Sequence, residues 1–387
     1  MATITQTETT GSKVLCHDKY ENGQSADDLQ SREISPNRGF MLADSVETDD
    51  IHMSQADFRD KYNIDKAKQI KLSKLAFMRY QHPDLQQIKT FLKDFGLFKV
   101  KETADEIWFR GYGADQYVYY ARRGPKQFLG GAFEVESYGE LERALSIPET
   151  KVLSNGIEEL KDAPGGGHIV TLSDPEDFPI SLVYGQTPGQ AQEMPRDLLF
   201  NNETHKPRVR EWSRFKPGPA AVHKLGHYGL VVRDFQSQLN FYTKNFNLMP
   251  TNILYVDDGN EKTDVGMFAH VDRGTEVVDH HTLFLVSLPP GHEIPHVHHC
   301  SFEIHDFDTQ AMGHEWLTRK GYKPAWGVGR HILGSQIFDY WWDPNDFMVE
   351  HYIDGDVVNG ETPVSFHAAA SAKDAAWSPD VPSSFLE

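Results

Sequence analysis

The chain has 387 residues, two cysteines and a formal net charge of −19, from 38 basic and 57 acidic side chains. This acidic balance disfavours binding to nucleic acid or to anionic membrane surfaces, and so few cysteines disfavour a disulfide-stapled fold. No run of about 18 apolar residues occurs, and the start lacks the pattern of a secretory signal, so we expect a cytoplasmic protein without a membrane partner.

The first periodic structure follows a polar stretch. Residues 1–70 are rich in Ser, Thr, Asp and Gln and are expected to form a tail, with a short helix at SQADFRDKYNI. A short apolar run around Leu75 then precedes an amphipathic segment with Asp84 as a plausible N-cap and Gly96 as a stop. This order predicts a strand followed by a helix.

The same strand–helix pattern recurs at KLGHYGLVVRDFQSQLNFYTKNFNL, which starts at Lys224. Two further landmarks repeat in the same order: residues 130–145 resemble 299–317, and 173–185 resemble 342–355. Three paired landmarks predict a tandem duplication in which each copy contains strand–helix, strands, strand–helix and strands.

The length is typical of two domains, and the composition suggests where they begin and end. The segment between the copies is Pro-rich and is expected to be a linker. The predicted organisation is a tail at 1–70, a first domain at 71–186, a linker at 187–220, a second domain at 221–356 and a C-terminal tail at 357–387.

The two copies differ at three positions that could bind a metal ion. Each position carries a possible ligand in the second copy and a residue without ligand character in the first. The pairs are His227 with Phe77, His299 with Gly130, and Glu350 with Ser181. Two imidazoles and a carboxylate on separate strands can occupy one face of an octahedral metal and suit Fe(II), although zinc accepts the same ligands.

The segment GRHILGSQIFDYWWDPNDFMVEHY resembles the signature of type I extradiol ring-cleavage dioxygenases of the vicinal oxygen chelate superfamily. That signature has a Gly-x-His, a Tyr nine residues after the His, an Asp-Pro turn, and a ligand Glu ten residues after the Tyr. Here the catalytic pair is His331 and Tyr340, and the ligand is Glu350. VHHCSFEI and LGHYGLVV match the contexts of the other two ligands, His299 and His227.

The resemblance covers roughly residues 70–355 and implies a fold and a reaction. The fold is α+β, with tandem βαβββ units in two barrel-like domains and the active site in the C-terminal one. The reaction is insertion of both atoms of O2 into a small aromatic diol of the catechol type, with ring cleavage next to the diol. Fe(II) is the implied cofactor, Mn(II) is an alternative, and we expect a homo-oligomer.

The resemblance also implies three catalytic side chains besides the ligands. His331 and Tyr340 would hydrogen-bond the bound substrate, and His280 would be the acid–base catalyst, since an imidazole has an ordinary pKa of about 6.5. The match at DHHTLFL is looser, and the doubled histidine leaves the choice between His280 and His281 open.

Two other functions use the same fold. A glyoxalase-like isomerase or related metal enzyme usually needs a second glutamate ligand and needs neither His331 nor Tyr340. A non-catalytic small-molecule binding protein needs no metal, so the complete ligand set argues against it.

Overall fold

The computed structural model describes residues 41–42, 51–148, 150–369 and 375–385, and Gly39–Glu387 form one structural unit. An N-terminal module follows the first sequence copy. Its elements are β3 (Leu72–His82), α2 (Leu85–Phe95), β4 (Phe98–Glu102), β5 (Glu106–Arg110), β6 (Tyr119–Arg123), β7 (Gln127–Val135), α3 (Tyr138–Ala144), β8 (Glu158–Glu159), β9 (His168–Ser173) and β10 (Pro179–Tyr184).

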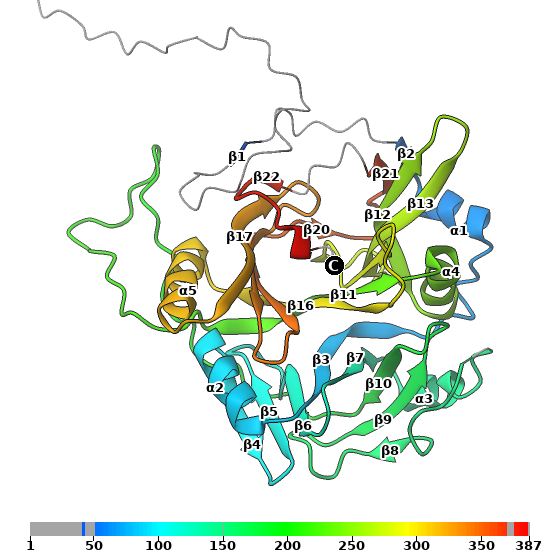
Figure 1. Ribbon diagram of the computed structural model, residues 1–387, viewed down its shortest axis with the longest axis horizontal. Coiled ribbons are helices and arrows are strands. Elements are labelled where there is room, and N and C mark those ends of the chain that lie inside the picture. The colour runs from blue at the N-terminus through cyan, green and yellow to red at the C-terminus, as the bar shows by residue number, and fades with distance from the viewer. Residues whose placement is uncertain (1–40, 43–50, 149, 370–374, 386–387) are drawn as a thin grey trace, which may run out of the picture. The chain divides into compact units, whose positions relative to one another are not determined.

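A C-terminal module follows the second copy and extends beyond it (Figure 1). Its elements are β11 (Val222–Val232), α4 (Phe235–Asn245), β12 (Leu248–Asp257), β13 (Lys262–Val271), β14 (Val278–Asp279), β15 (Leu283–Ser287), β16 (His296–Ile304), α5 (Phe307–Arg319), β17 (Lys323–His331), β18 (Ile337–Trp342), β19 (Met348–Ile353), β20 (Val357–Val358), β21 (Val364–Ala368), β22 (Ala375–Ser378) and the 3₁₀ turn η2 (Ser383–Phe385). Three short elements precede both modules: β1 (Met41–Leu42), β2 (Ile51–Met53) and α1 (Gln55–Tyr62).

Each module is built on one mixed sheet. In the N-terminal module the strand order is β4-β5-β6-β3-β7-β10-β9-β8. In the C-terminal module it is β1-β22-β17-β18-β19-β16-β11-β15-β13-β12-β21-β2, and β14 pairs separately with β20. In Figure 1 the C-terminal sheet curves around an interior space, with α4 and α5 outside it. The predicted α+β fold with tandem βαβββ units is confirmed.

The helix ends follow the local sequence. The Asp84 side chain accepts hydrogen bonds from the backbone N–H groups of Gln86 and Gln87, which caps α2 as predicted. Gly96 ends the helix with φ of 107°. A Cβ at this position would lie 1.7 Å from the Ala220 carbonyl oxygen, so only glycine fits here.

Strand register shows that the two modules are equivalent at the level of single residues. In each, the central strand pairs antiparallel with the strand that opens the second βαβββ unit, and that strand pairs parallel with the last one. The candidate ligand positions fall in the same register. Phe77 and Ser181 both pair with Ala132, and His227 and Glu350 both pair with Ser301.

The largest hydrophobic cluster spans both modules. Phe133 of the first module and Tyr228 of the second are fully buried in the same cluster, with ring centroids 6.1 Å apart. At the end of α2, Phe95 stacks on His351 with centroids 3.7 Å apart, and its carbonyl oxygen accepts a hydrogen bond from His351 Nε2 at 2.7 Å. His351 follows the candidate ligand Glu350, so the first module contacts the strand that carries it.

Two segments predicted as tails differ from the prediction because they contribute to the C-terminal sheet. Within 1–70, β2 pairs with β21, and α1 buries Phe58 completely. Within 357–387, β21 pairs with β12 and β22 pairs with β17. Short edge strands can be polar because one of their faces meets water, so composition alone marked these segments as tails. The remainder of the N-terminal prediction lies outside the described residues.

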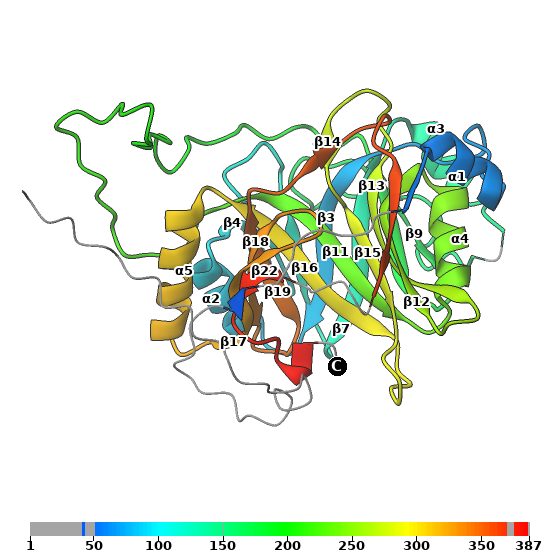
Figure 2. The ribbon, with the colours of Figure 1, turned by 90° about the horizontal axis from the view of Figure 1, so that it is seen from above.

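The predicted linker contains no helix or strand between β10 and β11. Among the described residues, the helices are too short or too polar to cross a bilayer. Figure 2 shows the linker leaving the body next to α5 and returning to it.

Candidate metal centre and active-site cavity

Three neighbouring strands bring the candidate ligands together. His227 lies on β11, His299 on β16 and Glu350 on β19, and all three side chains are buried. His227 Nε2 lies 3.1 Å from His299 Nε2 and 3.2 Å from Glu350 Oε2, and His299 Nε2 lies 3.5 Å from the same oxygen. These donor atoms form a small triangle that one ion can touch.

The donor set fits a divalent metal ion. Donor atoms bound at about 2.1 Å and at right angles lie about 3 Å apart, close to the observed separations. Both carboxylate oxygens of Glu350 are buried without a hydrogen-bond partner among the described residues. A buried carboxylate without a partner is costly, and an ion at the centre of the triangle would satisfy it.

A chain of hydrogen bonds sets the orientation of His299. The carbonyl oxygen of Phe385 can only accept, so His298 Nε2 donates to it at 2.9 Å. Burial lowers the pKa of His298 to about 4, so this imidazole is neutral and its Nδ1 is an acceptor. His298 Nδ1 lies 2.6 Å from His299 Nδ1, which must then donate. His299 Nε2 is left with a free lone pair towards the triangle, as a metal ligand needs.

His331 and Tyr340 meet beside this triangle. They lie on β17 and β18, which pair antiparallel, and His331 Nε2 is 2.9 Å from Tyr340 Oη. The Tyr340 ring packs edge-on against His299 with centroids 5.2 Å apart. His331 stacks on Phe338 at 4.1 Å. The sequence spacing of nine residues therefore becomes a hydrogen-bonded pair next to a candidate ligand.

The structure distinguishes the two histidines that the sequence left open. His281 lines the cavity and lies 4.0 Å, centroid to centroid, from His227. His280, the residue preferred from the resemblance, does not line the cavity, and its Nδ1 lies 3.1 Å from His281 Nδ1. Both histidines lie between β14 and β15, outside the regular strands, and of the two only His281 reaches the cavity.

Burial sets the protonation of this pair. It lowers the pKa of His280 to about 3 and that of His281 well below its ordinary value. Both imidazoles are therefore neutral near pH 7, and His281 can offer a lone pair or an N–H group to a molecule in the cavity.

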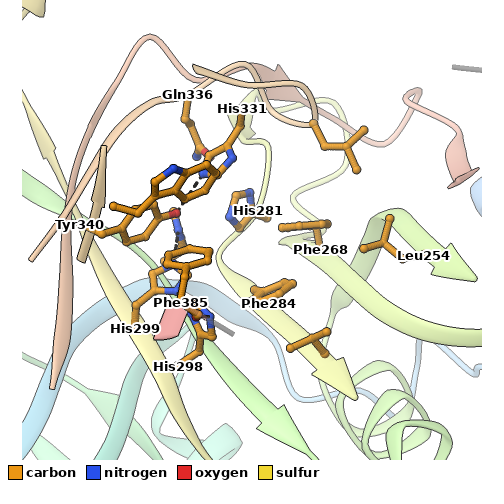
Figure 3. A pocket seen from close by; sticks show the side chains of 14 residues that line it. Leu254, Phe268, His281, Phe284, His298, His299, His331, Gln336, Tyr340 and Phe385 are labelled. Atoms are coloured by element: carbon orange, nitrogen blue, oxygen red, sulfur yellow. Dashed lines mark hydrogen bonds between the residues drawn. The ribbon is translucent and has the colours of Figure 1, made fainter. Parts of the chain in front are cut away.

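The cavity has a volume of about 140 Å³ (Figure 3). Its walls combine polar side chains with apolar and aromatic ones, and among the described residues no lysine, arginine, aspartate or glutamate lines it. The lining residues are His227, His281, His298, His299, His331, Gln336 and Tyr340, together with Leu254, Phe268, Phe284, Val286, Trp326, Leu333 and Phe385.

Most residues that line the cavity were not predicted from the sequence. Phe268 and Phe284 stack at 4.8 Å on strands whose alternation gives no sign of which side chain faces a cavity. Phe385 reaches the cavity from a segment interpreted as a tail. A lone phenylalanine in polar surroundings was the available signal, but it is equally common at ordinary surfaces.

A family model supports the assignment of the C-terminal module. Residues 224–350 match the Glyoxalase/Bleomycin resistance protein/Dioxygenase superfamily. This range starts in β11 and ends at Glu350, so it contains all three candidate ligands and the His331–Tyr340 pair.

Two curated proteins are similar in sequence to this chain. The chain is 31% identical over 165 residues to Metapyrocatechase 2 of Cupriavidus necator, a match that covers 42% of this chain and 47% of that relative. It is 22% identical over 286 residues to 3-methylcatechol 2,3-dioxygenase of Pseudomonas putida, covering 72% of this chain and 89% of that protein. The chain thus spans about half the length of the first relative.

Solved structures share the fold. The Mn(II)-bound glyoxalase from Novosphingobium aromaticivorans superposes with a TM-score of 0.65 at 22% identity, covering 82% of this chain and 95% of that one. Homoprotocatechuate 2,3-dioxygenase from Arthrobacter globiformis gives 0.63 at 17% identity, covering 79% and 88%. The fold and site therefore define a two-module protein of the vicinal oxygen chelate type with a candidate metal site in one module. The resemblance to the extradiol dioxygenases of the vicinal oxygen chelate superfamily is confirmed, and the match to the family model covers residues 224–350.

Proposed function

We propose that the protein is a metal-dependent extradiol dioxygenase that cleaves the ring of a catechol next to its diol. The observation that carries this proposal is the position of the His331–Tyr340 pair, which shares one cavity with His227 and His299, two of the three candidate ligands. The named sequence relatives support the same reaction class.

His227, His299 and Glu350 would hold the ion, for which we propose Fe(II), with Mn(II) as the alternative. Fe(II) bound there would bring the diol and O2 together and mediate electron transfer between them. The other contributions come from side chains of the protein itself. The buried triangle excludes water, and the Phe385–His298–His299 hydrogen bonds fix one ligand in the required tautomer.

Proton movement is assigned to three side chains. Tyr340 Oη and His331 Nε2 form a hydrogen-bonded pair that would hold a diol oxygen and take up its proton. His281, neutral because it is buried, would act as the acid–base group on the opposite side of the cavity. We propose His281 in place of His280.

The cavity favours a small, uncharged substrate. An apolar cavity of about 150 Å³ holds benzene, and the volume here, about 140 Å³, is similar. Because no lysine or arginine of the described residues lines the wall, a carboxylate on the ring would be buried without a cationic partner from this part of the chain. We therefore propose a single-ring catechol with hydrogen or a small alkyl group as substituent. The two cysteines and acidic surface also favour the cytoplasm as its location.

A glyoxalase-like isomerase remains the competing function, because a glyoxalase shares the fold. The discriminating residues are His331 and Tyr340, which that chemistry does not need.

The test is anaerobic reconstitution with Fe(II) or Mn(II), followed by oxygen uptake with catechol, 3-methylcatechol and a carboxylated catechol. We expect one metal ion per chain and uptake of one O2 per ring cleaved, with the uncharged catechols preferred. A metal-loaded protein that consumes no oxygen with any catechol would contradict the proposal. Conversion of a glutathione hemithioacetal would then favour the isomerase.

A further inference from the structure

The linker between the modules forms an arm, defined here as residues 194–216, that projects beyond α5 (Figures 1 and 2). It contains no helix or strand. Several large apolar side chains are exposed along it, and Trp212 and Val209 are 74% and 72% exposed. The complete set is Met194, Leu198, Leu199, Phe200, Val209, Trp212 and Phe215. So many apolar side chains on one short segment are typical of an interaction surface.

The tip of the arm has a defined local structure. The Asn202 side chain accepts hydrogen bonds from the backbone N–H groups of Thr204 and His205 at 3.0 and 2.7 Å. The Asn201 side chain exchanges two hydrogen bonds with the backbone of Arg208. These bonds close a turn from 201 to 208, so the apolar side chains are presented by an organised loop.

The base of the arm is fixed to the body next to α5. Arg196 forms ion pairs with Asp306 and Asp308. Its carbonyl oxygen accepts a hydrogen bond from His305 Nε2 at 2.7 Å, and its guanidinium lies 4.6 Å from the centre of the Phe215 ring. The arm therefore leaves the body in a set direction.

The charge of the arm is opposite to that of the molecule. Residues 194–216 contain six basic and three acidic side chains, a net charge of +3. The whole chain carries −19, so the other residues together carry −22. A basic and apolar arm is thus complementary to the acidic body of another copy of the same chain.

A groove at the base of the arm provides a matching surface. It has a volume of about 360 Å³ and an apolar floor that includes Phe215, Met312 and Trp316. Its charged lining is Asp308, Glu315 and Arg319, with Asp308 paired to Arg196 and Glu315 paired to Arg319. Because arm and groove are adjacent on one chain, a two-fold axis beside α5 would place each arm in the groove of the other copy. A two-fold interface of this kind is self-complementary and closed.

We infer that the arm is an exchange element that binds a second copy of this chain, with Val209 and Trp212 in the α5 groove of the partner. The contact buries the exposed apolar side chains of both arms at once and brings Arg208, Arg210 and Arg214 towards acidic surface. This inference is independent of the proposed reaction.

Sedimentation velocity across a concentration series tests the exchange. We expect the wild type to be a dimer or a multiple of one. A Val209→Asp/Trp212→Ala double variant should weaken self-association by at least about 30-fold, the loss typical of a single interface hot spot. High salt should weaken it further. Leu153→Asp is the matched control, since Leu153 is 50% exposed on the N-terminal module, and it should leave association unchanged.

A cross-link tests the groove itself. Trp212→Cys and Met312→Cys, each in a Cys16→Ser background and carrying different tags, should form a disulfide between the two variants when mixed and oxidised. A wild type that stays monomeric, arm variants that associate normally, or a mixture without this disulfide would each overturn the inference. A monomer that binds anionic vesicles through the arm would overturn it in favour of a membrane surface.

Discussion

The N-terminal module fills the space that the C-terminal module leaves open. Ser181 and Thr171 occupy the positions of Glu350 and Tyr340, and both accept hydrogen bonds from the guanidinium of Arg79, at 2.8 and 2.9 Å. The space that could hold a metal ion and a diol in the C-terminal module is occupied in the N-terminal module by the guanidinium of Arg79.

The reverse substitution opens the second module. Arg79 corresponds in register to Gly229, where a Cβ would lie 2.6 Å from the Phe284 ring and 3.5 Å from His299 Cε1. In the first module, Phe77 replaces His227 and packs on Tyr117 with centroids 4.4 Å apart. The two modules therefore differ in free volume as well as in candidate ligands. The C-terminal module has a glycine beside its cavity, whereas the N-terminal module fills the equivalent space with the side chain of Arg79.

The largest effect should come from removing the carboxylate in one module and its counterpart in the other. Glu350→Ala should reduce bound metal to background and abolish oxygen uptake, because two imidazoles alone hold a divalent ion poorly. Ser181→Ala is the matched control and should change neither. Metal analysis and oxygen electrode readings check this. Metal retained at full occupancy in Glu350→Ala would place the ion elsewhere.

The next effect separates chemistry from metal binding. Tyr340→Phe and His331→Phe should each keep the metal but lose about 10² to 10⁴ in turnover, the usual contribution of a positioned proton-transfer group. Thr171→Val, at the position equivalent to Tyr340, should cost stability through Arg79 and leave turnover unchanged. Single-turnover kinetics on metal-loaded protein measure the loss. Wild-type rates in both Phe variants would leave this pair without a catalytic function.

A smaller effect distinguishes the adjacent histidines. His281→Ala should reduce turnover by about 10²-fold, whereas His280→Ala should act only through the orientation of His281 and reduce it less. Rescue by added imidazole in His281→Ala, but not in His280→Ala, would identify the group that faces the cavity. The opposite pattern would restore the assignment made from the sequence.

The smallest effect concerns stability and compares two equivalent turns. Asp174 and Asp343 each accept two backbone hydrogen bonds. Tyr242 also donates to Asp174, whereas Asp343 Oδ2 has no partner among the described residues. Burial raises the pKa of Asp174 to about 6 and that of Asp343 to about 7, from an ordinary value of 3.8.

The pH dependence follows from these values. Between about pH 4 and 7 the unfolded chain has lost the Asp343 proton while the folded chain keeps it, so the free energy of unfolding falls as pH rises through this window. Asp343→Asn removes this loss of stability. The free energy of unfolding of the variant relative to that of the wild type should therefore be higher at pH 8 than at pH 4, by on the order of 3 kcal/mol. Asp174→Asn should show a smaller gain. Urea titrations at both pH values measure this difference. A stability difference between variant and wild type that is the same at pH 4 and pH 8 would contradict the prediction.

The sequence predicted the fold, and it singled out three candidate ligands whose donor atoms the structure brings close together, because both depend on local patterns. Asp84 and Gly96 mark helix ends by their own chemistry, and His227, His299 and Glu350 stand out against a second copy of the same strands. The cavity wall could not be predicted in this way. Phe268 and Phe385 line one cavity only because segments distant in sequence come together, and of the two adjacent buried histidines only His281 reaches that cavity.

The stacked contact between Phe95 and His351 gives a reason for the persistence of the N-terminal module. A module without candidate ligands would ordinarily be under little selective constraint. This module, however, contacts His351, the residue that follows Glu350. Mutations that loosen the packing of α2 would alter the surroundings of His351, one residue from the candidate ligand Glu350. Selection on the C-terminal module would therefore act on the N-terminal module as well, and the two should evolve as a single inherited unit.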